Sequence, residues 1–395
     1  MRILVGWDNA EETDLMTLYL NVDENDVQMI GDPDVFLEKA KEEFWDVILM
    51  TVSLPDTERG YEIFSEIREA QPNVPLVGAC HPEEVYMIAR FMTGGMKQYI
   101  PRDANGDYLF LVYTQLESVV DAVRAEREQK LAERLREEID SVRKLQESMI
   151  PRDLYCPDEY EIVARYEPSQ IQVVGGSPVI MAGGDYYDVF SLDDKSIVLL
   201  VGDASGHGMK ACMSIMTMHT LVRMIRGQQY QDTASFVQEV NKRLCEQSVI
   251  QDEGGFITLL YGLLNAEENT FQWTSAGHPA PLLHALESGD ITPIGPPEVA
   301  GLPLGLYEDA EYETNTFVIP ATSRLLLYTD GIEEAFPEGG MVHDQFGMEG
   351  IEATMRREKT NSLDATLQAL FDDSSAHTKG AGRHDDTSVV LLGRD

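Results

Sequence analysis

Short apolar runs alternate with helical patterns in the first part of the chain. The helical patterns place apolar side chains three or four residues apart, as at Tyr61, Phe64 and Ile67, and at Val85, Ile88 and Met92. The apolar runs between them are Arg2–Val5, Val47–Val52, Val74–Val77 and Gln98–Ile100. This alternation predicts a parallel sheet with helices on both faces, an α/β doubly wound domain over residues 1–113.

A helical segment is predicted over residues 114–151. No Gly or Pro occurs from Leu116 to Met149, and Pro151 ends the segment. Apolar residues recur in steps of three or four at Leu131, Leu135, Ile139, Val142, Leu145 and Met149. The pattern predicts an amphipathic connector, interpreted as a two-stranded coiled coil that forms a homodimer. The alternative is a single helix that packs on its own domain.

Strand-like runs dominate residues 152–395. Four helical stretches interrupt them, at 211–225, 235–245, 350–357 and 363–371. The strand-like runs are Ile162–Tyr166, Ile197–Val201, Phe256–Leu264, Phe271–Thr274, Phe317–Ile319, Leu325–Tyr328 and Val389–Leu392. This order predicts an α+β layered β-sandwich rather than a second doubly wound sheet.

The length, composition and net charge of the chain limit its number of domains and the kinds of molecule it is expected to bind. The chain has 395 residues, which suggests two or three domains, and its 43% hydrophobic content is enough for buried cores. The net charge of −39 disfavours nucleic acid and anionic membranes as partners. Whether the acidity reflects a saline habitat or a function is left open by the sequence.

The cysteines and the apolar runs indicate a cytoplasmic location. The four cysteines, Cys80, Cys156, Cys212 and Cys245, form no CxxC motif, as expected for free thiols in a reducing compartment. The chain has no signal-peptide pattern at its start, and no apolar run approaches the roughly 18 residues of a membrane span.

Acidic residues lie at the ends of several predicted strands or next to glycine. Asp203 follows the run Ile197–Val201 and is followed by small residues; alone, it is equally well explained as the cap of a helix that begins near Met209. Similar acidic positions are Asp185, Asp330 and the pair Asp385-Asp386. Together they predict carboxylates that converge on hard cations, with Mg²⁺ or Mn²⁺ favoured over zinc.

The segment from Asp46 to Pro55 resembles the third strand and following loop of response-regulator receiver domains. In that family an aspartate ends this strand and is phosphorylated. The matching residue here is Thr51, a degenerate phosphoacceptor position. The resemblance therefore implies a receiver fold without the phosphorylation chemistry.

Other receiver positions also depart from the family. The acidic pair after the first strand falls on Trp7 and Asp8, the hydroxyl position falls near Gly78-Ala79, and the lysine position falls on Arg102. We interpret the domain as a pseudo-receiver used for docking or dimerisation. The alternative is a remnant that only supports the fold.

Motifs in the C-terminal part resemble the SpoIIE-type branch of the PPM, or metal-dependent type 2C, serine/threonine phosphatases. The resemblance covers residues 145–395 and begins with the segment from Leu145 to Pro151. The motifs occur in the family's order: Gly183-Gly184-Asp185, Gly202-Asp203, Ser205-Gly206-His207-Gly208, Ser275-Ala276-Gly277-His278-Pro279, Leu302-Pro303-Leu304-Gly305, Thr329-Asp330-Gly331, Phe346-Gly347 and Asp385-Asp386.

The resemblance implies a site for two divalent cations, Mn²⁺ or Mg²⁺. Asp203 would bridge them, and Asp385 is preferred over Asp386, which is not excluded. The remaining ligands carried over are Asp330 for the first cation, and Asp185 and the Ala204 carbonyl for the second. Two such cations lower the pKa of a shared water towards about 7, so that no protein nucleophile is needed. Ser205 and Ser275 are therefore not expected to be catalytic.

Other polar residues near the motifs have weaker assignments. His207 is a possible general acid, whereas His278 is expected to be structural. Tyr186 and Tyr187 are expected to pack in the core. Arg383 and His384 could contact substrate phosphate, but a solvated loop is the preferred expectation.

The resemblance implies hydrolysis of phosphoserine or phosphothreonine on a protein substrate. The family's typical substrate is an anti-sigma-factor antagonist in a partner-switching pathway, and we expect the pseudo-receiver and connector to regulate the activity. The alternative is a catalytically silent signalling scaffold. A DNA-binding response regulator is disfavoured by the acidity and by the lack of a basic helix.

Overall fold

The chain divides into two compact units, Met1–Leu135 and Arg136–Asp395. The computed structural model describes residues 1–21, 25–103, 105–151, 153–171, 179–206, 208–228, 230, 232–247, 255–295, 300–337, 339–340 and 342–394. The limits expected for the domains, at residues 113 and 151, stay predictions.

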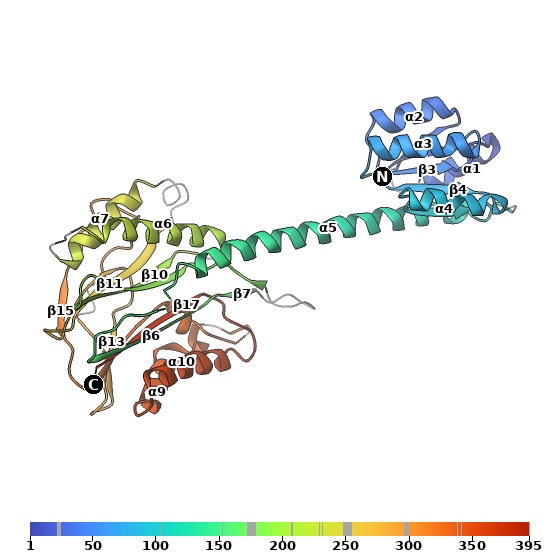
Figure 1. The fold of residues 1–395 in the computed structure, drawn as a ribbon. Coiled ribbons are helices and arrows are strands. Elements are labelled where there is room, and N and C mark those ends of the chain that lie inside the picture. The colour runs from blue at the N-terminus through green and yellow to red at the C-terminus, as the bar shows by residue number, and fades with distance from the viewer. Residues whose placement is uncertain are drawn as a thin grey trace. The chain divides into compact units, whose positions relative to one another are not determined.

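The first unit is built on a five-stranded parallel sheet with the order β2-β1-β3-β4-β5 (Figure 1). Its strands are β1 (Arg2–Gly6), β2 (Asp26–Ile30), β3 (Val47–Thr51), β4 (Leu76–Cys80) and β5 (Gln98–Pro101). Its helices are α1 (Ala10–Leu20), α2 (Pro33–Glu42), α3 (Thr57–Ala70), α4 (Val85–Thr93, preceded by the 3₁₀ turn η1, Pro82–Glu84) and α5 (Leu109–Glu147).

Each face of this sheet is covered by its own set of helices. Leu4 and Ile48 belong to a core shared with α2, α3 and α4, whereas Ile3 and Val47 belong to a core shared with α1 and α5. Neighbouring residues of a strand point to opposite faces, so near-continuous apolar runs fit a sheet that is buried on both sides. The predicted doubly wound arrangement is confirmed. Strand β2 was not predicted, because this edge strand is only half-buried and its apolar signal is weak.

Helix α5 belongs to both units. Its first turns pack through Leu109, Val112 and Leu116 into the core of the first unit, and it continues without interruption to Glu147. Farther along the helix, Leu131 and Leu135 are 59% and 55% exposed. The long helix is therefore present, whereas the coiled coil and the dimer stay predictions.

The second unit contains two five-stranded antiparallel sheets and a short two-stranded one (Figure 1). The first sheet has the order β15-β12-β11-β10-β9, and the second has the order β14-β13-β16-β17-β6. The strands are β6 (Tyr160–Glu167), β7 (Gln170–Ile171), β8 (Val179–Ile180), β9 (Asp185–Ser191), β10 (Ser196–Ala204), β11 (Ile257–Asn265), β12 (Thr270–Ala276), β13 (Leu282–Ala285), β14 (Asp290–Pro293), β15 (Asn315–Val318), β16 (Ser323–Tyr328) and β17 (Thr387–Arg394). The helical elements are α6 (Met209–Ile225), α7 (Thr233–Cys245), α9 (Gly347–Arg357) and α10 (Leu363–His377), with 3₁₀ turns η3 (Asp330–Ile332) and η4 (Val342–Asp344).

Three cores hold these elements in four layers. Alternate residues of β10 divide between two of them: Val198 packs towards α6 and α7, whereas Leu199 packs towards the second sheet. On the outer face of the second sheet, Leu326 and Leu391 pack against α9 and α10. The result is a helix–sheet–sheet–helix sandwich, which agrees with the predicted layered class.

Two expectations about the whole chain can be compared with the structure. All four cysteines are free thiols, as predicted. Among the described residues, no helix combines the length and the apolar character that crossing a membrane requires.

Candidate active site

Two of the predicted carboxylates face each other across neighbouring strands. Asp203 lies near the end of β10 and Asp185 begins β9, and the antiparallel register pairs these two residues directly. The two carboxylates lie close enough for each to shift the pKa of the other. Asp185 is only 2% exposed. The pairing of β9 with β10 therefore brings together two acidic motifs that are separated in the sequence.

Thr329 connects this pair to the second sheet. Its hydroxyl donates to Oδ2 of Asp185 at 2.5 Å and accepts from the backbone N–H of Ser388 at 2.8 Å. Asp330, the next residue, begins η3 directly after β16. The hydroxyl thus fixes Asp185 relative to the ends of β16 and β17, where Asp330 and Asp385 lie.

Asp386 is buried and is held by the backbone. Its two carboxylate oxygens accept hydrogen bonds from the N–H groups of Ser169 at 2.7 Å and Gly184 at 2.6 Å. A Cβ atom on Gly183 would lie 2.4 Å from this carboxylate, so glycine is needed for the close approach. Asp385 accepts a 2.8 Å hydrogen bond from the backbone N–H of Asp386. The two residues of the acidic pair therefore have different surroundings.

The Ala204 segment packs closely on the same glycine loop. The Ala204 N–H donates to the Gly184 carbonyl at 2.9 Å. A Cβ atom on Gly184 would lie 2.8 Å from the Ala204 carbonyl oxygen and 3.3 Å from Oδ1 of Asp203. Gly184 therefore allows the predicted Ala204 carbonyl and Asp203 to lie beside the start of β9.

The pKa values describe a site crowded with negative charge. Burial raises the pKa of Asp203 to about 8, and repulsion from Asp330, Asp385 and Asp386 adds to the effect. The pKa of Asp185 is raised well above its usual value by burial and then by Asp203 and Asp386. Burial and Asp385 also raise the pKa of Asp330. Since each carboxylate opposes ionisation of the others, a cation among them would relieve the repulsion.

This donor set fits hard divalent cations. Its carboxylate and carbonyl oxygens are the ligands that Mg²⁺ and Mn²⁺ prefer. Within the described ranges, however, no three or more His, Cys, Asp or Glu side chains form a ready-made metal-binding group. The carboxylates are close enough to shift one another's pKa, and the assignment of individual ligands stays a prediction.

Gln146, near the end of α5, contacts the backbone beside the candidate site, which the sequence did not reveal. It is 1% exposed. Its Nε2 donates to the carbonyls of Gly183 at 3.0 Å and Asp185 at 3.3 Å, and its Oε1 accepts from the Gly183 N–H at 2.8 Å. A glutamine in a highly charged helix is usually a solvated residue, so the helix composition gave no signal of this role.

His278 is enclosed within the fold. Its Nδ1 pairs with the Thr258 hydroxyl at 2.9 Å and its Nε2 with the Tyr328 carbonyl at 3.0 Å. Burial lowers the pKa of His278 to about 4, so the ring is neutral at pH 7. The Ser275 hydroxyl donates to the His278 carbonyl at 2.7 Å. These contacts join the loop after β12 to β11 and β16, in agreement with a structural role.

The expectation of a solvated loop was wrong for Arg383. Its side chain is 5% exposed, forms a 2.7 Å ion pair with Glu167 and donates to the Phe371 carbonyl at 3.1 Å. It also lies over the Phe371 ring. His384 stacks on Phe336, with ring centroids 4.2 Å apart. Arg383 therefore holds α10 near β6 and is not available to bind phosphate.

The remaining expectations concern Tyr186, Tyr187 and His207. The two tyrosines are 1% and 5% exposed and pack in different cores on the two faces of β9. Tyr186 also pairs through its hydroxyl with Nδ1 of His219 at 2.5 Å. His207, the possible general acid, lies outside the described residues.

In the first unit, an arginine occupies the acidic pocket of the receiver fold. Arg102 follows β5, its side chain is 2% exposed, and it forms 2.8 Å ion pairs with Asp8 and Glu12. The guanidinium lies over the Trp7 ring, 4.6 Å from the centroid. The sequence identified Asp8 and Arg102, but it missed Glu12, because this second carboxylate comes from α1 and not from the strand end.

Thr51 ends β3 and is fully buried. Within the described part of the chain, its hydroxyl has no hydrogen-bond partner. A threonine hydroxyl is a poor phosphoacceptor in a site built for aspartate, and the nearby acidic pair already has a cationic partner in Arg102. Both observations support the interpretation as a pseudo-receiver.

A four-layered sandwich with carboxylates clustered at its strand ends defines the class of metal-dependent protein phosphatases. Residues 193–395, just over half of the chain, match the family model for Stage II sporulation protein E (SpoIIE). Residues 3–112 match the response regulator receiver domain. The chain belongs to the SpoIIE family, whose enzymatic class is protein serine/threonine phosphatase.

Individual relatives are distant. The chain is 22% identical over 320 residues to the phosphoserine phosphatase RsbU of Bacillus subtilis (strain 168), covering 79% of this chain and 87% of RsbU. It is 25% identical over 199 residues to the phosphoserine phosphatase RsbP of the same organism, covering 49% of this chain and 45% of RsbP. The SiaA-PP2C domain of Pseudomonas aeruginosa shares the fold, with a TM-score of 0.54 at 15% identity, covering 67% of this chain and 99% of that domain.

Proposed function

We propose that the protein hydrolyses phosphoserine or phosphothreonine on a protein substrate, with two divalent cations held by Asp203, Asp185, Asp330 and Asp385. The observation that carries this proposal is the direct pairing of the buried Asp185 with Asp203 across β9 and β10, where the charge of Asp203 raises the pKa of Asp185. A binding scaffold has no need to bury such repulsion. The cations, when bound, would supply an activated water and positive charge for the phosphoryl oxygens.

The chain's own residues have separable roles in this proposal. Asp203 is near enough to Asp330, Asp385 and Asp386 for each to raise its pKa, which supports its assignment as the bridging ligand. Thr329 and Gln146 orient Asp185 through its side chain and its backbone carbonyl, respectively. The preference for Asp385 as a ligand is supported by Asp386, whose two oxygens already accept backbone hydrogen bonds. We therefore assign Asp386 to positioning of the Gly183-Gly184 loop.

The proposed substrate is an anti-sigma-factor antagonist in a partner-switching pathway. The family resemblance supplies this substrate class, and the match along 87% of RsbU supports a related arrangement of parts. We also propose a cytoplasmic location, since four free thiols suit a reducing compartment.

Regulation is proposed to pass through α5. Its exposed leucines Leu131, Leu135 and Leu145 suit a homodimeric coiled coil, and Gln146 joins the end of the same helix to the backbone on both sides of Gly184. A shift of the helix end would therefore move Asp185. If removal of residues 1–113 left both the activity and the oligomeric state unchanged, this part of the proposal would be wrong.

Hydrolysis of p-nitrophenyl phosphate by the full chain tests the proposed activity. We expect turnover that requires Mn²⁺ and is lost in Asp203→Asn. Asp290→Asn, an exposed substitution on β14, is the matched control and should retain activity. Absence of turnover together with absence of Mn²⁺ binding by calorimetry would contradict the proposal and favour the silent scaffold.

A further inference from the structure

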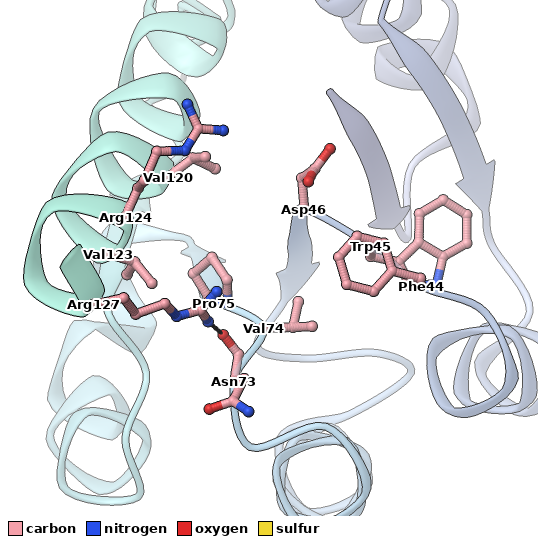
Figure 2. Close-up of a pocket in the computed structure, with 10 residues that line it drawn as sticks. All are labelled: Phe44, Trp45, Asp46, Asn73, Val74, Pro75, Val120, Val123, Arg124 and Arg127. Carbon is pink, nitrogen blue, oxygen red and sulfur yellow. Dashed lines mark hydrogen bonds between the residues drawn. The ribbon is translucent and has the colours of Figure 1, made fainter. Parts of the chain in front are cut away.

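Two adjoining cavities lie in the first unit at the amino ends of its strands, and residues of α5 line both of them. Figure 2 shows the first of these cavities. Their volumes are about 120 and 250 Å³, and they share Val74, Pro75, Val123 and Arg127 among their walls. Asp8, Thr51 and Arg102 lie at the carboxyl ends of strands of the same sheet. The cavities are therefore separate from the receiver pocket, at the other end of the sheet.

Cationic side chains dominate the walls of these cavities. The cations are Arg68, Lys97, Arg124, Arg127 and Lys130, and the carboxylates are Asp46 and Glu126. This concentration is unusual in a chain with 30 basic and 69 acidic residues. A concave surface of one sign concentrates ligands of the opposite charge.

Both carboxylates already have partners. Glu126 forms ion pairs with Lys97 at 3.2 Å and with Lys130 at 2.7 Å. Oδ2 of Asp46 accepts a 2.7 Å hydrogen bond from the backbone N–H of Arg2. Neither carboxylate is therefore paired with Arg68, Arg124 or Arg127.

The arginines retain donors that point to no carboxylate. Arg127 reaches from α5 to the Asn73 carbonyl (Figure 2), and Arg68 donates to the Pro72 carbonyl at 2.5 Å. Each contact uses one of the five N–H groups of a guanidinium. Among the described residues, the side chain of Arg124 has no hydrogen bond or ion pair. An oxyanion could thus be bound without breaking an existing ion pair of these arginines.

We propose that the two cavities form a binding site for a small phosphorylated molecule. Guanidinium groups form paired hydrogen bonds with the oxygens of a phosphate or a carboxylate, and several cations around one site favour the more highly charged phosphate. The apolar wall formed by Phe44, Trp45 and Val120 suits a ring or other apolar part of the ligand. The combined space is of the order of known small-molecule sites. A nucleoside diphosphate has this combination of charge and apolar surface.

Calorimetric titration of the full chain with inorganic pyrophosphate tests the phosphate site. The buffer contains EDTA, because divalent cations could otherwise recruit pyrophosphate to the acidic site of the second unit. We expect saturable binding at one site, weakened at least tenfold in Arg124→Gln and in Arg127→Gln, as for loss of a charged hydrogen bond. Arg59→Gln is the matched control, since Arg59 pairs with Asp34 and Glu62 outside the cavities.

Two results would overturn the phosphate site. One is the absence of saturable heat with pyrophosphate. The other is a failure of the variants to differ as expected. Wild type, Arg124→Gln and Arg127→Gln would then bind pyrophosphate equally, or Arg59→Gln would lose as much affinity as the two cavity variants. Circular dichroism of each variant separates lost binding from lost folding. Arg124→Gln is the most informative variant because its side chain supports no described contact.

A second titration with ADP tests the apolar wall. ADP should bind more tightly than pyrophosphate. The Phe44→Ala substitution should lower the affinity for ADP and leave the affinity for pyrophosphate unchanged. Phe44 is 69% exposed, so this substitution does not open the core. Equal affinity for the two ligands would overturn the role given to the apolar wall.

Discussion

Gln146 is hydrogen-bonded to both the N–H and the carbonyl of Gly183, two residues before Asp185. The side-chain amide of Gln146 thereby satisfies the backbone N–H and carbonyl of Gly183, as a neighbouring strand would. Because Gln146 lies one residue before the end of α5, the last turn of the helix and the start of β9 form one connected structure.

Replacement of Gln146 by Ala should loosen the Asp185 segment. The buried Gly183 N–H and carbonyl would lose their partner, which costs about 1–3 kcal/mol of stability. We expect a lower unfolding midpoint in urea and weaker Mn²⁺ binding by calorimetry. Gln129→Ala, at an exposed position of α5, is the control. Unchanged Mn²⁺ affinity in Gln146→Ala would show that the contact does not position Asp185.

Substitutions of Asp385 and Asp386 should have different effects. Asp386→Asn keeps one acceptor oxygen but places an NH₂ group against a backbone N–H, so the metal-free protein should lose about 1–3 kcal/mol of stability. Asp385→Asn should leave the metal-free protein at least as stable as wild type, because it removes a charge that repels Asp203 and Asp330, and it should abolish the stabilisation by Mn²⁺. Thermal unfolding in EDTA and in Mn²⁺ measures both effects. The reverse pattern would make Asp386 the ligand.

Arg102 should be important for the stability of the first unit. Arg102→Met leaves Asp8 and Glu12 without their cation and should cost about 2–4 kcal/mol, somewhat less than for a fully buried pair. Arg90→Met removes the exposed pair with Glu58 and should cost less than about 1 kcal/mol. Urea unfolding of the full chain compares them. Equal losses would mean that the Arg102 pairs contribute no more than a surface pair.

The Glu12 carboxylate should make stability depend on pH in the acid range. Burial acts to raise its pKa, but hydrogen bonds from Tyr108 and Trp7 and the charge of Arg102 outweigh it, so that the pKa lies below its usual value of 4.5. The corresponding stability is present above about pH 4.5 and is lost as pH falls through the lowered pKa. In urea unfolding between pH 3 and 6, wild type should lose more stability on acidification than Glu12→Gln. Parallel pH profiles would contradict this assignment.

Periodicity predicted the layers of both units well, because buried strands and helices leave strong apolar patterns. It did not predict β13 and β14, whose runs are short and carry polar residues, or β9, whose apolar run is interrupted by Asp188. The acidic motifs identified Asp185 and Asp203, but only strand pairing places them opposite each other. The roles of Glu12 and Gln146 could not be predicted either, since each depends on a contact between distant segments. Burial of Arg383 likewise follows from the packing of α10 against β6.

The ion pairs of Arg102 have a consequence for the timing of signals. In a phosphorylated receiver, the added charge is removed by hydrolysis, and the signal decays at that chemical rate. Here Arg102 is paired with both Asp8 and Glu12, and Thr51 replaces the phosphoacceptor. A signal passed through this unit as proposed would begin when a partner or ligand binds and end when it dissociates, so that a dissociation rate constant would set its duration.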